Sequence, residues 1–327
     1  MRLTLPGFVD LQVNGFGGVD FNGPRLEAER VEHALDRMRA TGVTRCLPTL
    51  ITSSFDDFAV RARILGRLNQ PAIAGIHMEG PYLSPEDGPR GAHPREHIIP
   101  AAIDDFRRRQ DAASGRIRMV TLAPEVPGAL PLIEYLVRAG VRVAIGHTAA
   151  QPSTIADAIS AGATLATHLG NGCAAVLPRH PNVIWELLAA DDVFATLIVD
   201  GHHLPASTVK SLVRAKGPER TVLITDAIAA AGSPPGRYTL GTVDTELDAD
   251  GRVSLPGTPY LAGSSLTMDR AIANTARFTG LPIDRIVPMA STIPADYLGM
   301  STRGTVTADW DPVAHRLTVM KVETPDQ

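Results

Sequence analysis

The sequence predicts an α/β fold, namely a (β/α)8 barrel of eight parallel strands with surrounding helices. Eight short runs rich in Val, Ile and Leu occur before residue 230, and unbroken apolar runs are typical of parallel strands covered on both faces. Segments of helical periodicity separate these runs, which is the βα pattern of a parallel sheet. Four of the runs end in His, Glu or Asp, and the catalytic groups of a barrel come from the C-terminal ends of its strands.

The predicted strands and helices alternate along the first 230 residues. The strands are expected at 8–14, 43–50, 72–79, 117–123, 141–147, 163–168, 194–200 and 221–226. Helices are expected at 26–38, from residue 54 onward, and at 102–113, 128–139, 152–161, 183–190 and 205–215. No Gly-x-Gly-x-x-Gly turn follows the first strand, so an open dinucleotide-binding sheet has no support.

Two of these helices carry further local signals. In the segment 26–38, four apolar residues fall on one helical face: Val31, Ala34, Leu35 and Met38. Gly42 follows as a stop signal. The hydroxyl of Ser54, in Ser54-Phe-Asp-Asp57, is expected to cap the free N–H groups of the second helix.

The pattern changes after the eighth strand. Segments 237–243 and 251–255 flank Asp248-Ala-Asp250-Gly251, a hairpin turn signal, so a β-hairpin insertion is expected near 236–256. Helices are expected at 265–278 and 291–299. We therefore expect a barrel over residues 1–302, which includes the hairpin, and two C-terminal strands over 303–327 that are the remnant of a small β domain.

Composition excludes several classes of function. The chain has 327 residues, with 31 Lys and Arg against 35 Asp and Glu, and this balance does not favour nucleic acid as a partner. No apolar run reaches the roughly 18 residues of a membrane span, and the N-terminal stretch is too short before Pro6 for a signal peptide. Cys46 and Cys173 form no disulfide framework, so a cytoplasmic location is expected.

The four polar strand ends are Glu79, His147, His168 and Asp226. Two imidazoles and a carboxylate form a metal site with an open coordination position, which predicts metal-bound water as the nucleophile of a hydrolysis. Asp226 would act as general base and then general acid. Any one of these residues could be a satisfied polar side chain at the start of a loop, but four at successive strand ends favour a common reaction centre.

The segments around these residues are similar to the N-acetylglucosamine-6-phosphate deacetylases, a family of the amidohydrolase superfamily. The similarity runs in order from about residue 6 to about residue 305. It rests on Pro6-Gly-Phe-Val-Asp-Leu-Gln-Val-Asn-Gly-Phe-Gly-Gly-Val-Asp20, His77-Met-Glu-Gly-Pro-Tyr82, Gly146-His-Thr, Ala166-Thr-His-Leu-Gly-Asn171, Asp200-Gly-His-His203, Thr225-Asp-Ala and Leu261-Ala-Gly-Ser-Ser-Leu-Thr-Met268.

The resemblance implies an enzyme of amino sugar metabolism that converts N-acetylglucosamine 6-phosphate and water into glucosamine 6-phosphate and acetate. It implies metal ligation by Glu79, His147 and His168, with Asp226 as the catalytic aspartate and His93 near the scissile carbonyl. It further implies substrate contacts, most of them to the phosphate end, by Asn171, Gly172, His203 and Arg179. Because the family arginine reaches the phosphate from a neighbouring subunit, the resemblance also implies a homodimer.

The first strand bears on the number of metal ions. Many amidohydrolases carry His-x-His there and bind two ions, whereas this chain has Gln12-Val-Asn14. Neutral amides are poor ligands beside imidazole and suit hydrogen bonding, so we expect one divalent ion per chain. Zinc is the default for a nitrogen and oxygen site with an open position, and iron or another first-row metal also fits.

The chain departs from the family in three places, one of which is the stretch 174–185, where Arg179-His180-Pro181 is the only familiar element. Family members usually carry several strands before the Pro-Gly-Phe motif, and here the motif begins at Pro6, so the β-sandwich domain is expected to be much reduced or absent. Gly170, Gly172 and Cys173 replace an aromatic residue, an alanine and a methionine. These changes keep two alternatives open: a deacylase for another N-acyl amino sugar or amine, and a catalytically silent sugar-phosphate binding protein. Asp226 argues against the second, because a binding protein has no need of a base there.

Overall fold

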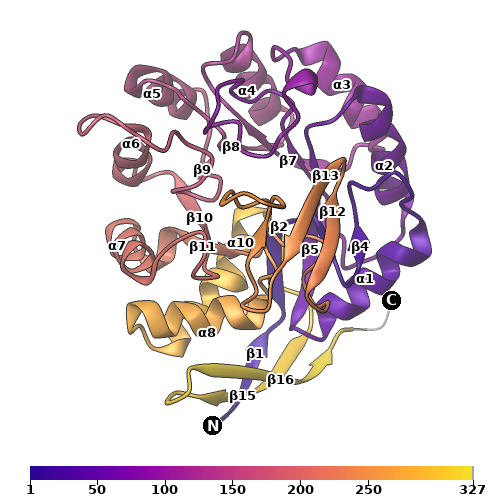
Figure 1. Cartoon of the computed structure of the whole chain (residues 1–327), viewed down its shortest axis with the longest axis vertical. Coiled ribbons are helices and arrows are strands. Elements are labelled where there is room, and N and C mark those ends of the chain that lie inside the picture. The colour runs from indigo at the N-terminus through magenta and orange to yellow at the C-terminus, as the bar shows by residue number, and fades with distance from the viewer. Residues whose placement is uncertain (326–327) are drawn as a thin grey trace. The chain divides into compact units, whose positions relative to one another are not determined.

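Eight parallel strands form the central sheet of the computed structural model, which describes residues 1–325 (Figure 1). Their order is β11-β10-β9-β8-β7-β6-β5-β2. At the two ends of this order, Val13 at the end of β2 forms a parallel bridge with Ala227, which follows β11. The sheet is therefore a nearly closed barrel, as predicted.

All eight predicted barrel strands occur, most of them shorter than expected. They are β2 (Phe8–Val13), β5 (Val43–Ile51), β6 (Ile76–Glu79), β7 (Ile117–Leu122), β8 (Arg142–Ile145), β9 (Leu165–Ala166), β10 (Phe194–Ile198) and β11 (Thr221–Ile224). Every residue of β2, β6, β9 and β11 is buried. Burial of both strand faces explains why the sequence shows unbroken apolar runs instead of alternation.

The chain divides into two compact units. The first comprises Met1–Thr49, Leu68–Ala74 and Leu197–Gln327, and the second comprises Leu50–Arg67 and Gly75–Thr196. Among residues 1–325, no helix has the length and apolar character required to cross a membrane.

The first unit contains the helices α1 (Ala28–Arg39), α7 (Ala206–Lys216), α8 (Met268–Thr279), α9 (Ile283–Ile286) and α10 (Thr292–Tyr297), with short 3-10 helices at η2 (Pro218–Arg220) and η3 (Val287–Ala290). The buried residues of α1 are the four that the sequence places on one face: Val31, Ala34, Leu35 and Met38. After this helix, Gly42 has a φ of 91°, which a glycine adopts without the cost of a side chain. A two-stranded hairpin of β3 (Gly15–Phe16) and β4 (Val19–Asp20) follows β2.

The second unit contains α2 (Phe55–Arg67), α3 (Ile103–Ala112), α4 (Ala129–Arg138), α5 (Pro152–Ser160), α6 (Val183–Ala189) and the 3-10 helix η1 (Arg95–His97). The predicted cap is present, since the Ser54 hydroxyl oxygen accepts a hydrogen bond from the backbone N–H of Asp57 at 3.1 Å. Each α-helix of this unit begins within one residue of its expected start, and α5 and α6 begin at the expected residue. Periodicity and local caps together locate these helices well.

The insertion after β11 differs in detail from the expected hairpin. It is a three-stranded antiparallel sheet of β12 (Gly236–Leu240), β13 (Val243–Leu247) and β14 (Val253–Ser254). The chain reverses first at Gly241, whose φ is 63°, and again at the Asp248–Gly251 turn. Only the second reversal was expected from the sequence, because Asp-Gly is the stronger turn signal.

A second small sheet contains the C-terminal strands. β15 (Thr305–Asp311) and β16 (Arg316–Glu323) are antiparallel, and β1 (Arg2–Pro6) adds to the free edge of β15. Strand β1 was not expected from the sequence. Its signal is the alternation of exposed Arg2 and Thr4 with half-buried Leu3 and Leu5, which is too short to stand out alone.

Candidate active site

Three side chains of the second unit converge on one point. Glu79 is the last residue of β6, and His147 and His168 each lie two residues beyond a strand, β8 and β9 respectively. The Nε2 atoms of the two histidines are 3.1 Å apart, and they lie 3.3 and 3.2 Å from Oε1 of Glu79. All three side chains are buried. The structure thus brings together the three residues that the sequence predicts as metal ligands.

The protonation of His147 follows from its outer contact. Its Nδ1 lies 2.9 Å from the carbonyl oxygen of Pro89, which can only accept a hydrogen bond. The proton of a neutral His147 is therefore on Nδ1, and Nε2 presents a lone pair toward Glu79 and His168. Burial alone would raise the pKa of Glu79, but when His147 and His168 are protonated their hydrogen bonds and charge outweigh burial and hold this pKa well below its usual value.

This donor set fits a divalent cation. Two imidazole nitrogens and one carboxylate oxygen lie within 4.8 Å of one another. Three protein ligands of this type are the ordinary content of a metal site that keeps a position open for water or substrate. His168 also has a buried Nδ1 with no hydrogen-bond partner among residues 1–325. The group can therefore hold a metal ion, and its chemistry does not choose between zinc and other first-row metals.

Backbone strain concentrates at the same residues. Within residues 1–325, five non-glycine residues have positive φ, and three of them are His147 at 51°, His168 at 31° and Asp226 at 50°. The left-handed region costs a side chain-bearing residue about 1 to 2 kcal/mol, so the surrounding contacts must hold each one in place. Strained residues of this kind cluster at functional sites.

Two glycines approach the imidazoles closely. A Cβ atom on Gly172 would lie 3.0 Å from Nδ1 of His147 and 3.2 Å from Cε1 of His168, and one on Gly91 would lie 3.2 Å from Cε1 of His147. Next to Gly172, Asn171 bonds the backbone oxygen of His168 through both its backbone N–H and its side-chain amide. The loop that follows β9 is therefore packed directly against the metal ligands.

His93 lies beside the same group. Its ring centroid is 4.4 Å from that of His147, and its Nε2 is 4.0 Å from Oε2 of Glu79. Burial, aided by the nearby His147, lowers the pKa of His93 to about 3, so its imidazole is neutral at physiological pH. On the other side of the ring, Nδ1 lies 2.9 Å from the hydroxyl oxygen of Thr52. Thr52, which follows β5, was not expected from the sequence because it carries no motif of its own.

Asp226 lies in the first unit, two residues beyond β11. Its Oδ1 accepts hydrogen bonds from the side-chain amides of Gln12 at 3.2 Å and Asn14 at 2.7 Å. The amide oxygen of Asn14 is buried with no partner among residues 1–325, which leaves an acceptor beside the carboxylate. The two amides of the first strand thus hold the catalytic candidate through hydrogen bonds.

His203 is paired with a carboxylate that the sequence analysis did not single out. Its Nδ1 lies 2.6 Å from Oδ2 of Asp200, and both side chains are largely buried. Oδ1 of Asp200 accepts the backbone N–H groups of His202 and His203. Burial opposes the ionisation of Asp200, but the hydrogen bond from His203 prevails and lowers its pKa. The spacing of Asp and His in Asp200-Gly-His-His203, a local Asx-type turn, is the signal that could have found it.

Arg179 has a different setting from the other predicted substrate ligands. It lies on an exposed segment between β9 and α6. Among residues 1–325 it forms no hydrogen bond or ion pair with another side chain of this chain. Nearby, Val176 and Trp185 are 87% and 52% exposed. This segment presents a cation and apolar side chains to the outside.

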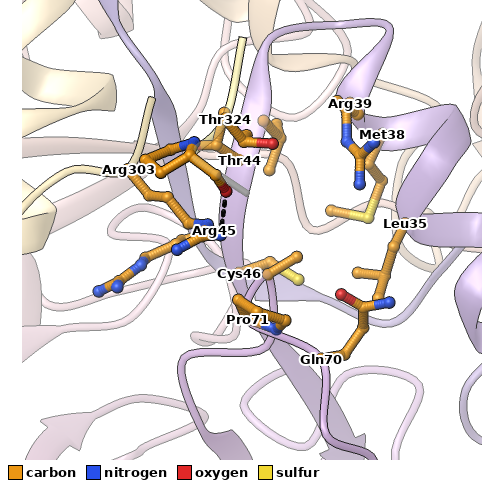
Figure 2. Close-up of a pocket in the computed structure, with 13 residues that line it drawn as sticks. Leu35, Met38, Arg39, Thr44, Arg45, Cys46, Gln70, Pro71, Arg303 and Thr324 are labelled. Atoms are coloured by element: carbon orange, nitrogen blue, oxygen red, sulfur yellow. Dashed lines mark hydrogen bonds between the residues drawn. The ribbon is translucent and has the colours of Figure 1, made fainter. Parts of the chain in front are cut away.

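A separate cavity of about 180 Å³ lies at the start of β5 (Figure 2). Figure 2 shows Leu35 and Met38 of α1 beside it, with Cys46 of β5 and Pro71 of the loop between α2 and β6. None of the predicted site residues lines it. Since the catalytic groups of a barrel come from the other ends of the strands, this cavity is not the candidate active site.

Comparison with protein families gives one match over most of the chain. The Amidohydrolase family model matches residues 3–314. The N-acetylglucosamine-6-phosphate deacetylase of Lysinibacillus sphaericus is 32% identical over 315 residues, which cover 95% of this chain and 80% of that protein. The N-acetylgalactosamine-6-phosphate deacetylase of Shewanella sp. (strain ANA-3) is 34% identical over 324 residues, covering 94% and 79%.

Solved structures give the same result at the level of the fold. A variant of the N-acetyl-D-glucosamine-6-phosphate deacetylase from Mycobacterium smegmatis, in complex with N-acetyl-D-glucosamine-6-phosphate, superposes with a TM-score of 0.90 at 34% identity, over 98% of this chain and 86% of that one. The N-acetylglucosamine-6-phosphate deacetylase from Thermotoga maritima superposes with a TM-score of 0.86 at 27% identity, over 98% and 87%.

Proposed function

Because the chain belongs to the amidohydrolase family and is a hydrolase of amide bonds, we propose that it removes the acetyl group of N-acetylglucosamine 6-phosphate. Water and the substrate would give acetate and glucosamine 6-phosphate. The observation that carries the proposal is the buried group of Glu79, His147 and His168, whose donor atoms meet at one point. Curated relatives similar over most of the chain are named for this reaction.

The proposed metal centre holds one divalent ion, with zinc as the first choice. Glu79, His147 and His168 would be its protein ligands. Such an ion lowers the pKa of a coordinated water to about 7 and polarises a carbonyl group. One ion is proposed because Gln12 and Asn14, at the positions where a second site would need histidines, are engaged in hydrogen bonds with Asp226.

Asp226 is the proposed proton carrier. Its carboxylate would take a proton from the attacking water and deliver it to the amine nitrogen as the C–N bond of the acetamide breaks. The hydrogen bonds from Gln12 and Asn14 limit the rotation of this carboxylate. His93, neutral because burial lowers its pKa, would contact the substrate near the scissile carbonyl.

The phosphate end of the substrate is assigned to Asn171, Gly172 and His203, and to Arg179 of the partner subunit. We therefore propose a homodimer with shared sites. The exposed side chains of Val176 and Trp185, close to Arg179 in sequence, support this because a second copy would cover them. The free thiols of Cys46 and Cys173 agree with a reducing compartment, so the proposed location is the cytoplasm.

The test is release of acetate by the purified chain loaded with zinc or iron. The panel contains N-acetylglucosamine 6-phosphate, its unphosphorylated form, N-acetylgalactosamine 6-phosphate, and N-acyl variants of the first sugar. We expect N-acetylglucosamine 6-phosphate to give the highest kcat/KM and the unphosphorylated sugar a much lower one. Absence of acetate from the whole panel, with metal bound and the sugar phosphate still bound by calorimetry, would favour a binding protein instead.

A second substrate has its own support. Gly170 and Cys173 alter the loop that follows β9, and one similar relative is named for N-acetylgalactosamine 6-phosphate. The same panel separates the two sugars, since they differ only in the configuration at one carbon. A higher kcat/KM for the galactosamine derivative would reassign the substrate and leave the reaction unchanged.

A further inference from the structure

A buried carboxyl group of the first unit takes no direct part in the proposed reaction. Asp10, on β2, is fully buried. Its Oδ1 accepts hydrogen bonds from the backbone N–H groups of Gln12 and Thr225, both at 3.2 Å. Its Oδ2 accepts the hydroxyl of Thr225 at 2.5 Å. An apolar residue would occupy this position without the cost of a buried carboxyl group, and these three contacts offset part of that cost.

Thr225 directly precedes Asp226, and the contacts around it fix the backbone on both sides of that residue. The hydroxyl oxygen of Thr225 accepts the backbone N–H of Ala227 at 3.2 Å. The hydroxyl of Ser264 donates to the backbone oxygen of Thr225 at 2.6 Å. The backbone N–H of Ser264 donates to the backbone oxygen of Asp226 at 3.0 Å. The backbone N–H of Asp226 donates to the backbone oxygen of Gln12 at 2.9 Å.

These contacts surround a residue in a strained conformation. Asp226 has a φ of 50°, which the chain would leave if the segment were free. Asp10 also bonds the backbone of Gln12, whose side-chain amide donates to Asp226. The same carboxylate therefore holds Asp226 from two directions, through its neighbour in sequence and through its hydrogen-bond donor.

We propose that Asp10 and Thr225 are positioning residues that hold the carboxylate of Asp226 in the orientation required for proton transfer. The kinetic part of this inference rests on the proposed function. The structural part, that the two residues fix Asp226 against Gln12 and Asn14, stands on the contacts alone.

Thr225→Val tests the inference with little change in shape, because it exchanges only the hydroxyl for a methyl group. We expect kcat for acetate release to fall about 10-fold to 100-fold, as for a displaced catalytic group, with KM and bound metal unchanged. Thr225→Ser keeps the hydroxyl and should restore most of kcat. Thr245→Val is the matched control, since Thr245 is equally buried in β13 and its hydroxyl has no partner among residues 1–325. It should leave kcat unchanged.

A double-mutant cycle separates positioning from a general loss of structure. In the Asp226→Asn background, Thr225→Val should cause no further loss of the residual activity, because the residue that it positions no longer carries protons. If Thr225→Val lowered activity by the same factor in the wild-type and Asp226→Asn backgrounds, the inference would be overturned. If Thr225→Val folds poorly, Asp10→Asn takes its place in the same double-mutant cycle.

A measurement made without substrate tests the positioning role independently of the proposed function. With asparagine-selective ¹⁵N labelling, the side-chain amide signal of Asn14, which donates to Asp226 at 2.7 Å, should shift or broaden in Thr225→Val and stay in place in Thr245→Val. An unmoved Asn14 signal would overturn the inference, whatever the enzyme hydrolyses. Failure of the wild-type chain to release acetate would overturn the proposed function and leave the NMR result to decide the inference.

Discussion

Gly172 shows how a single residue shapes the metal centre. Its φ is 58°, and a Cβ atom there would lie 3.0 Å from Nδ1 of His147. We predict that Gly172→Ala lowers metal affinity as well as stability, because the added methyl group pushes against two ligands. Stability should fall by at least the roughly 1 to 2 kcal/mol of a left-handed alanine. Zinc affinity by competition with a chelator, and urea unfolding, measure the two effects.

Gly115→Ala separates the effect of crowding against the metal ligands from the cost of a left-handed backbone conformation. Gly115 also has positive φ, at 77°, but no atom lies within 4 Å of its Cβ position. This control should lose stability to the backbone cost alone and keep its affinity for zinc. Equal zinc affinity in the two variants would show that Gly172 is not packed against the ligands as described.

The residues that the sequence could locate are those at the ends of apolar runs. Glu79, His147 and His168 each follow or end such a run, and the structure brings them together. Thr52 and Asp10 could not be found in this way, because their roles depend on partners far away in the sequence. The contact of Asp10 with Thr225 joins residues 215 positions apart, and no local pattern records it.

At the scale of elements, a buried carboxyl group on β2 makes the free energy of unfolding depend on pH. Burial raises the pKa of Asp10 from 3.8 to about 7. Between these values the folded chain keeps a proton that the unfolded chain has lost, so this residue makes the free energy of unfolding fall as pH rises from about 4 to about 7. We predict that Asp10→Asn removes this part of the pH dependence, because the amide does not titrate.

Urea unfolding of both proteins at several pH values in this range provides the test. The stability of wild type relative to Asp10→Asn should be greatest at the acid end and should decrease steadily toward neutral pH. Metal-free protein is used throughout, so that metal binding does not add its own pH dependence. Parallel stability curves for the two proteins would contradict the prediction.

Elements differed in how far the sequence could specify them. The eight barrel strands and α1 were predictable, because burial on two faces or on one stripe leaves a strong apolar pattern. β9, reduced to Leu165–Ala166, was expected to be longer, since the apolar run continues into the loop that carries His168. β1 and the first reversal of the β12–β14 sheet were missed. Both depend on pairing with an antiparallel neighbour, which short strands do not encode alone.

At the scale of the whole molecule, the proposed homodimer shares its sites. Arg179 is exposed within its own chain, so we predict that it completes the phosphate site of the other subunit. Arg179→Ala chains should turn over the sugar phosphate poorly, and Asp226→Asn chains should be nearly inactive. In a mixed dimer, the site that keeps Asp226 receives Arg179 from the other chain and is intact.

Dissociating and reassociating equal amounts of the two variants should therefore restore about a quarter of the wild-type sites, since about half of the dimers are mixed and each has one intact site. Mixing the proteins without dissociation is the control and should restore nothing. Activity that stays at the average of the two variants after exchange would place Arg179 outside the shared site. If analytical ultracentrifugation showed a monomer, the proposed homodimer would be overturned.

We propose that one metal ion, held by Glu79, His147 and His168, supports amide hydrolysis by this chain. Titration of metal-free protein with zinc, with acetate release from N-acetylglucosamine 6-phosphate followed at each step, tests it directly. We expect activity to rise linearly and to reach its plateau at one ion per chain, and His147→Ala to show no rise over the same range. A plateau at two ions per chain, or full acetate release by His147→Ala, would contradict it.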